Sequence, residues 1–288
     1  MSLLETVSSE LRSLPLGVHI TLESTPHILD PEVIDFQLTS SDQWSSDRYW
    51  IAWTETLGAW VTPDGNEVIL LVSDQADLTD LEGPLTTGLT SVIAGACLNL
   101  RGQVAIHANA VALNGRAVAF AGYSGMGKST LSAYCASRGA GFITDDVLIV
   151  NADGLVHPGN PRLKLYPHTG ESLGLNATEE TDYKIYYPPD QLGATLITQA
   201  VPIANLYLLA EGDRIYAEEL APSQAAFDLL THSYYAGRLL ASNPDLFDAY
   251  LRLVTQASVK KLFYPRDFKK LPEVYEFLLN EAQEASVR

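Results

Sequence analysis

Hydrophobic and polar residues alternate with a period of two at several places in the first hundred residues. Short runs of this kind occur at 18–22, 34–38 and 49–53, and the turn signal Asp64-Gly65 precedes a further predicted strand over 67–72. Such alternation is typical of strands that bury one face. Apolar residues at helical spacing instead predict helices over Leu3–Leu14 and Leu85–Leu100. We therefore expect residues 1–100 to form a separate α+β lobe.

The pattern becomes more regular after this lobe. Two strand-like runs, Val104–Leu113 and Arg116–Gly122, are joined by Asn114-Gly115. Asn-Gly is a strong hairpin signal because both central residues of a type I′ turn need a positive φ. A helix is then predicted from Lys128 to Arg138, with Gly139 as its left-handed cap.

The segment between the second strand and this helix, GYSGMGKS, fits the phosphate-binding pattern G-x-x-x-x-G-K-[ST]. Its glycines let the backbone turn successive N–H groups toward one point, where the helix also aims its positive dipole end. Lys128 is expected to reach the β- and γ-phosphates of ATP, and the Ser129 hydroxyl to bind Mg²⁺. The residues expected to bind the nucleotide are Gly122, Ser124, Gly125, Met126, Gly127, Lys128, Ser129 and Thr130.

Two adjacent aspartates, Asp145-Asp146, end the next predicted strand, Phe142–Thr144, and a second apolar run follows over Val147–Val150. Carboxylates inside an apolar run are costly to bury unless a cation or another partner needs them. Alternate residues of a strand point to opposite sides, so the two side chains should have different roles. One can hold Mg²⁺ while the other faces an acceptor hydroxyl. A turn with two solvated aspartates is the structural alternative.

Basic side chains near the loop and the aspartates are further candidates. His107 lies on the strand that precedes the hairpin turn, where a structural role is equally open. Arg162 and Lys164 alternate with apolar residues, so both charges should lie on one face of a strand. Cations in that position would stabilise a transferring phosphoryl group, and a solvated strand face is the alternative. Residues 168–200 are polar and predict a loop, with Lys184 as a modest candidate for a phosphate or peptide contact.

Composition restricts the partners. The net charge of −17 disfavours nucleic acid, because no basic excess is present to neutralise phosphates. The longest apolar stretch, Val92–Leu100, is too short and too polar to span a bilayer, and the N-terminus lacks the order of a signal peptide. Cys97 and Cys135 have apolar neighbours, as buried thiols of a reducing compartment do. We expect a cytoplasmic protein without nucleic-acid or membrane partners, and a homo-oligomer is left open.

The segment from His107 through the loop to the two aspartates resembles the catalytic domain of HPr kinase/phosphorylase. That bacterial family phosphorylates a serine of a carrier protein, and its fold is related to PEP carboxykinase. The histidine ahead of the loop, Arg138-Gly139 after the helix and the paired aspartates carry the resemblance. It implies an α/β fold with a P-loop kinase core and a mixed sheet over residues 101–288. It also implies that Asp145 is the base toward the serine hydroxyl, with Asp146 at the metal and phosphates and His107 positioning the phosphates.

The chain departs from that family downstream, where the Glu-x-x-Gly-x-Gly segment is missing. Pro158–Pro167 is instead similar to a segment of stand-alone relatives that include the lasso peptide kinases, which phosphorylate a serine of a ribosomal precursor peptide. We therefore expect an ATP- and Mg²⁺-dependent serine kinase of a peptide or small protein. A small-molecule hydroxyl kinase and a non-catalytic ATP-binding regulator are the alternatives. The expected catalytic residues are Asp145, Lys128, His107, Arg162 and Lys164, and the expected metal residues are Ser129 and Asp146.

Overall fold

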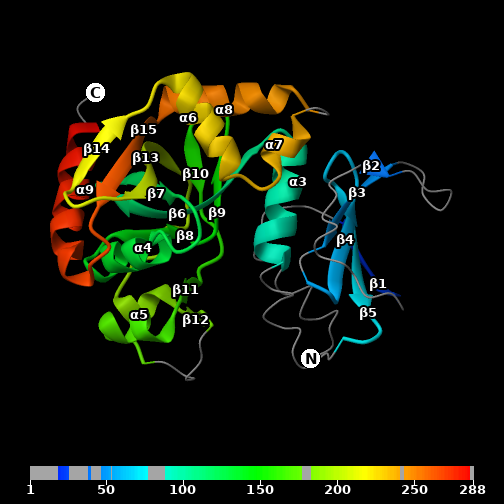
Figure 1. Cartoon of the computed structure of the whole chain (residues 1–288), viewed down its shortest axis with the longest axis horizontal. Helices are drawn as coiled ribbons and strands as arrows, with labels where there is room; N and C mark the ends of the chain where they lie inside the picture. Colours follow the sequence, from blue (N-terminus) through cyan, green and yellow to red (C-terminus); the bar gives the residue numbers. More distant parts are fainter. Residues whose placement is uncertain are drawn as a thin grey trace. The chain divides into compact units, whose positions relative to one another are not determined.

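The computed structural model of the chain describes residues 19–25, 38–39, 47–52, 54–76, 88–176, 183–240 and 243–285. These residues form a mixed α/β structure with several sheets (Figure 1). The chain divides into two compact units, residues 1–105 with 234–246 and residues 106–233 with 247–288. The sequence-based division lay between 100 and 101, and it left 234–246 in the second domain.

The first unit contains a five-stranded sheet. Its strand order is β1 (His19–Thr25), β5 (Glu67–Ser73), β4 (Leu57–Val61), β3 (Arg48–Ala52) and β2 (Leu38–Thr39). The predicted strands at 18–22, 49–53 and 67–72 are therefore confirmed within the described residues. A π-helical segment, Gly88–Ile93, leads into α3 (Ala94–Leu100), where a helix was predicted. The predicted helix Leu3–Leu14 and most of the predicted strand 34–38 lie outside the described residues.

Side-chain contacts explain why residues 234–246 belong with this unit. Asn99 of α3 is fully buried, and its side-chain amide donates to the carbonyl oxygen of Tyr234 over 2.8 Å. The Tyr234 ring fills the space beside Gly95, where an added Cβ would lie 2.2 Å from the ring. The short helix α7 (Ala236–Leu239) then also contacts α3. Such contacts between distant parts of the sequence leave no local signal.

The second unit is built on a larger mixed sheet. Its described strands follow the order β10 (Leu155–His157), β9 (Val147–Val150), β6 (Val104–Leu113), β7 (Arg116–Ala121), β13 (Val201–Glu211), β15 (Ser258–Tyr264) and β14 (Tyr216–Glu219), with β8 (Gly141–Thr144) paired to β6. Strands β7, β13 and β15 are parallel, whereas β6 is antiparallel to both β7 and β8. Strands β7 and β8 therefore point the same way, and their carboxyl ends meet at one edge.

The hairpin between β6 and β7 has the predicted turn. Asn114 and Gly115 have φ values of 52° and 76°, as a type I′ turn requires. The predicted helix is present as α4 (Lys128–Ser137), and Gly139 follows it with a φ of 95°. The local signals in this part of the sequence therefore predicted both elements and their ends.

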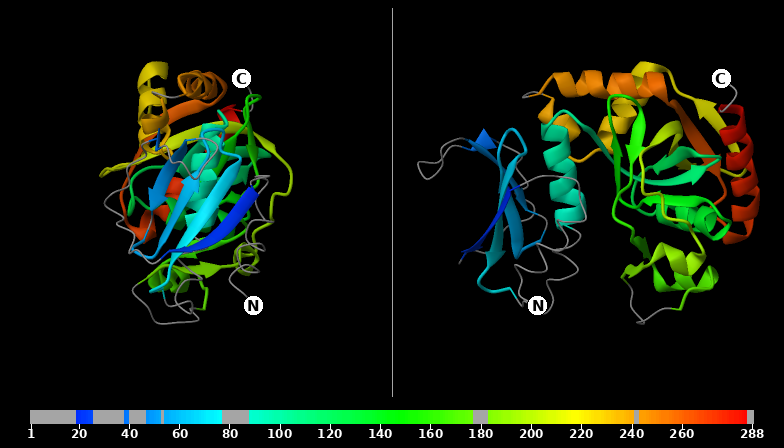
Figure 2. Two further views of the ribbon diagram at one scale, coloured as in Figure 1. Left: turned by 90° about the vertical axis from the view of Figure 1, so that its right-hand side faces the viewer. Right: turned by 180° about the vertical axis from the view of Figure 1, so that it is seen from behind.

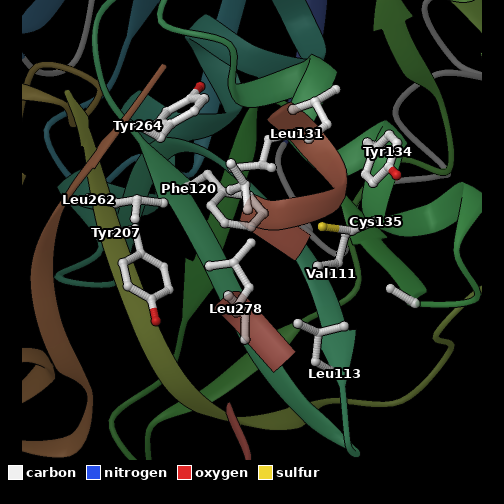
Figure 3. Packing of buried hydrophobic residues seen from close by; sticks show 14 of the residues in the cluster. Val111, Leu113, Phe120, Leu131, Tyr134, Cys135, Tyr207, Leu262, Tyr264 and Leu278 are labelled. Atoms are coloured by element: carbon white, nitrogen blue, oxygen red, sulfur yellow. The ribbon is translucent and has the colours of Figure 1, made fainter. Parts of the chain in front are cut away.

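Helices α4 and α9 (Leu271–Ala285) lie side by side over one face of this sheet (Figure 1). Their apolar side chains meet those of the strands in a buried cluster, in which the rings of Phe120 and Tyr207 stack at 6.3 Å (Figure 3). Helix α6 (Pro222–Thr231) contacts β15, and the Phe227 ring of α6 lies 5.5 Å from Phe247 of α8 (Asp245–Gln256). In the described ranges, no helix combines the length and the hydropathy needed to cross a bilayer.

A small subdomain packs on α4 from another side. It comprises the hairpin of β11 (Leu163–Leu165) and β12 (Ile185–Tyr187), the helix α5 (Pro167–Ser172) and a 3₁₀ turn at Pro189–Leu192. Its apolar residues bury themselves against α4 and β8, and the views in Figure 2 show it in yellow-green beside α4. The prediction of a loop over 168–200 was therefore incomplete, because part of this stretch forms a helix and a strand.

Candidate active site

The loop between β7 and α4 has a backbone that favours glycine at three positions. Gly122, Gly125 and Gly127 have φ values of 148°, 81° and 93°, a region that side chains with a Cβ rarely adopt. Gly127 is also the N-cap of α4, and an added Cβ there would lie 2.5 Å from the hydroxyl oxygen of Tyr264. The strand, glycine loop and helix expected for a phosphate-binding segment are therefore all present.

Tyr264 supports this loop from the end of β15. Its hydroxyl donates to the carbonyl oxygen of Met126 over 2.7 Å, and its ring is buried. Burial raises the pKa of Tyr264 to about 12, so the hydroxyl remains a donor at neutral pH. Sequence reasoning missed this residue, because nothing near position 264 shows that β15 ends behind the loop.

Lys128 folds back over the loop from the first turn of α4. Its Nζ donates to the carbonyl oxygens of Gly122, over 2.7 Å, and Tyr123, over 3.4 Å. The side chain is buried, and desolvation lowers its pKa. A cation held this way lies over the backbone that would cradle phosphates, as the motif requires.

Asp145 follows β8 and is buried beside the start of α4. Its Oδ1 accepts from the side-chain amide of Asn109 and from the Ser129 hydroxyl, the latter over 3.4 Å. Its Oδ2 accepts from the backbone N–H of Lys164 over 2.6 Å. Burial raises the pKa of Asp145 to about 7, and the neighbouring charge of Asp146 contributes to the increase. The carboxyl group therefore titrates near neutrality, although three donors favour its ionised form.

Asp146 points elsewhere, as predicted for adjacent residues. Its φ of 70° is left-handed, a conformation that non-glycine residues adopt mainly at turns and functional sites. Its Oδ1 lies 3.8 Å from Nε2 of His107, and its side chain is 23% exposed. Desolvation lowers the pKa of His107 and outweighs the charge of Asp146, which raises it, so the imidazole is neutral near pH 7.

His232 adjoins this pair, although sequence reasoning did not single it out. Its carbonyl oxygen accepts from the backbone N–H of His107 over 2.7 Å. Its ring meets the exposed ring of Tyr123 edge-on, with 4.8 Å between the centroids. His232 follows α6, about 110 residues after the loop, and its local sequence carries no catalytic motif.

Arg162 and Lys164 lie on one face of the β11–β12 hairpin, as predicted. Between them Leu163 is buried, and both charged groups lie over the ring of Tyr186, at 5.7 Å and 5.5 Å from its centroid. Lys184 is placed in the same way over Tyr166, at 5.6 Å. The backbone of Lys164 thus contacts Asp145, while its side chain extends along the hairpin.

The donor set at the end of β8 suits a Mg²⁺ ion that is shared with a nucleotide. Among the described residues, no group of three or more His, Cys, Asp or Glu could hold a metal ion by itself. Phosphate-bound Mg²⁺ needs only one or two protein oxygens, because phosphates and water complete its shell. The Ser129 hydroxyl and the Asp145 carboxylate, which are 3.4 Å apart, meet that requirement.

Comparison with known proteins adds little. No protein-family model matches the chain, and none of the curated proteins matches it. Among solved structures, the Hpr(Ser) kinase/phosphatase from Coxiella burnetii aligns with 63% of this chain and 98% of that chain, at 12% sequence identity and a TM-score of 0.33. A TM-score this low does not establish a shared fold, so the geometry of the site alone carries the assignment of function.

Proposed function

We propose that the chain is an ATP-dependent phosphotransferase that acts on a hydroxyl group. One observation carries the proposal: a glycine loop with Lys128 and Ser129 lies next to two carboxylates, Asp145 and Asp146, that face different surroundings. Phosphoryl transfer needs little covalent chemistry from the protein and depends on positioning and charge stabilisation. A loop for phosphates, a cation and two separate carboxylates supply both.

The phosphate side of the site consists of the loop, Lys128, Ser129 and Asp145. The loop N–H groups and the N-terminus of α4 would hold the β- and γ-phosphates, with Lys128 as their counter-charge. Ser129 and Asp145 would hold Mg²⁺, which neutralises charge that develops on the phosphate oxygens. The resemblance assigned the metal side to Asp146, but the 3.4 Å contact between Asp145 and the Ser129 hydroxyl favours the reverse assignment.

The acceptor side consists of Asp146 and His107. In the transfer step the acceptor oxygen forms a bond to the γ-phosphorus, the bond to the β–γ bridging oxygen breaks, and ADP leaves. Asp146 would take the hydroxyl proton, because its carboxylate is partly exposed and His107 lies 3.8 Å away. The neutral imidazole would line the acceptor side next to that carboxylate. Arg162 and Lys164 remain our candidates for stabilising the transferred phosphoryl group.

We infer that the acceptor is a serine of a peptide or small protein, including a ribosomal precursor peptide. The similarity of Pro158–Pro167 to the stand-alone peptide kinases supports this choice. A small-molecule hydroxyl kinase and a regulator that binds ATP without transfer are the competing functions. Each predicts a different response when serine peptides, free serine and a nucleoside are offered as acceptors.

The test combines nucleotide binding with phosphate incorporation. Lys128→Ala should lower ATP affinity by roughly 10²-fold, because removing one partner of a buried charge pair costs about 2–5 kcal/mol of binding free energy. Lys270→Ala is the control, since this lysine pairs with Glu273 on the surface. Unchanged ATP affinity in Lys128→Ala would contradict the proposal. ATP binding without transfer to any offered hydroxyl would instead favour the regulator.

A further inference from the structure

Asn109 is a buried polar residue that neither the loop motif nor the aspartate pair explains. It lies in β6 with no exposed surface. Its side-chain amide donates to Oδ1 of Asp145 and to the hydroxyl of Ser132, the latter over 3.1 Å. It therefore connects the carboxylate after β8 with the second turn of α4.

These contacts belong to a closed ring of hydrogen bonds. The Ser132 hydroxyl donates to the carbonyl oxygen of Ser129 over 3.2 Å, and the Ser129 hydroxyl donates to Oδ1 of Asp145 over 3.4 Å. Asn109 closes the ring between Asp145 and Ser132. The four residues come from β6, α4 and the end of β8, and all four are buried. Bonds linked in this way restrain one another, so the ring fixes the carboxylate relative to the helix.

The orientation of the Asn109 amide indicates what it contributes. An ionised carboxylate can only accept, so the amide must turn its NH₂ group toward Asp145. Its own Oδ1 is then buried without a hydrogen-bond partner, which is unfavourable. A leucine of similar size would avoid that loss. The benefit of an amide at this position therefore lies in the two bonds that it donates.

We propose that Asn109 is a positioning residue that, together with Ser132, holds the Asp145 carboxylate against Ser129 for the shared Mg²⁺ ion. This inference rests on the proposed function. Residues that orient a metal ligand from behind typically contribute 10–100-fold in metal affinity or activity. Neither the loop motif nor the paired aspartates involves β6 in this role.

The main test compares Asn109→Leu with Asn205→Leu. Asn205 is a matched control, because it is a 1% exposed amide of β13 in the same sheet, and its Nδ2 has no hydrogen-bond partner. ATP affinity is measured by calorimetry with and without Mg²⁺. In Asn109→Leu, the ratio of ATP affinity with Mg²⁺ to ATP affinity without it should fall about 10-fold. ATP affinity without Mg²⁺ should stay unchanged. Asn205→Leu should match the wild type in both measurements.

A loss of structure can be separated from a loss of positioning. Partial unfolding would reduce the fraction of protein that can bind ATP. It would not change the Mg²⁺ concentration at which the increase in ATP affinity is half-maximal. Should Asn109→Leu fail to fold, Ser132→Ala replaces it, because this variant removes the link from the amide to α4. Ser132→Ala should also raise the half-maximal Mg²⁺ concentration, by a smaller factor.

A second readout needs neither nucleotide nor activity. In the NMR spectrum, the side-chain amide of Asn109 is assigned by its loss in Asn109→Leu, and its proton resonance should shift in Asp145→Asn. An unshifted resonance, or a wild-type Mg²⁺ effect in folded Asn109→Leu, would overturn the inference. A wild-type protein that binds no ATP would refute the proposed function instead, and the NMR result would still decide whether Asn109 holds Asp145.

Discussion

Two acidic side chains of the second unit differ in what balances their charge. Glu281 of α9 forms an ion pair with Lys260 of β15 and accepts a hydrogen bond from the Tyr207 hydroxyl over 3.3 Å. Asp145 accepts only from neutral donors, an amide, a hydroxyl and a backbone N–H. Its neighbour in the sequence is a second carboxylate, Asp146. Across the described residues, no lysine or arginine forms an ion pair with Asp145.

The difference is the one expected between a structural cluster and the binding site that we propose. A partly buried ion pair such as Lys260–Glu281 is complete within the protein, so its loss should affect folding. Asp145 has no ion-pair partner among the described residues, and burial raises its pKa even though Lys164 and Lys184 act in the opposite direction. Strongly perturbed pKa values of this kind cluster at functional sites. The pKa of Asp145, about 7, fits the second case. Predictions for the two clusters should therefore separate into effects on stability and effects on ligand binding.

Asp146→Asn should have the largest effect. The change removes the proton acceptor from the acceptor side, so phosphate incorporation should fall roughly 10²–10⁴-fold. ATP affinity in the presence of Mg²⁺ should persist, because Asp145 and Ser129 are intact. Initial rates and calorimetry on the same preparation test both statements. A wild-type rate here, with the loss appearing in Asp145→Asn, would return the base role to Asp145.

Asp145→Asn should act on Mg²⁺ instead. Without this carboxylate, the gain in ATP affinity that Mg²⁺ provides should fall by at least about 10-fold, the lower bound for groups that only back a metal ligand. Affinity measured without Mg²⁺ should change little. ATP titrations with and without Mg²⁺ measure both affinities. A variant that loses ATP binding equally in both conditions would indicate a general role in loop structure.

Glu281→Gln should affect stability alone. Lys260 would keep its charge in a partly buried place without its counter-ion, so the free energy of unfolding should fall by about 1.5–3 kcal/mol. A Lys260→Met, Glu281→Met double variant should lose less, because no charge is left unpaired. Denaturant unfolding measures the loss. Altered ATP affinity in Glu281→Gln would break the distinction between the two clusters.

The pH dependence should be the mildest effect. Burial raises the pKa of Asp145 to about 7, so the group is protonated below that pH and ionised above it. Only the ionised form can bind Mg²⁺, so Mg²⁺-linked ATP affinity should fall by roughly 10-fold per pH unit below 7. The dependence should be absent in Asp145→Asn and unchanged in Glu281→Gln. A flat profile in the wild type would contradict this assignment.

Local signals predicted the backbone structure around the candidate site well. The Asn114-Gly115 turn, the glycine loop with its helix and the divergence of the two aspartates follow from residues within a few positions of one another. Tyr264, His232 and Asn109 were missed because their contacts depend on strand order. Tyr264, for example, reaches Met126 across 138 positions of sequence. The grouping of residues 234–246 with the first unit has the same cause.

The roles of the two aspartates show another limit of sequence reasoning. Alternation along a strand predicts that they point apart but not which one faces Ser129. That outcome depends on the backbone after β8, which ends at Thr144, and on the left-handed φ of Asp146. Aspartate adopts this region more often than most residues that carry a Cβ, but its presence in a sequence does not by itself fix that conformation.

The contact between Tyr264 and the loop also has a consequence for folding. Strands β6 and β7 are joined by a tight turn, and such hairpins form within microseconds. The loop that follows them receives its support from β15, which is separated by more than a hundred residues and must wait for slower long-range pairing. We therefore expect that, early in folding, the glycine loop follows the formed hairpin but has no fixed conformation. Competence to bind ATP would appear only as the last strands dock, which makes ligand binding a reporter of complete folding.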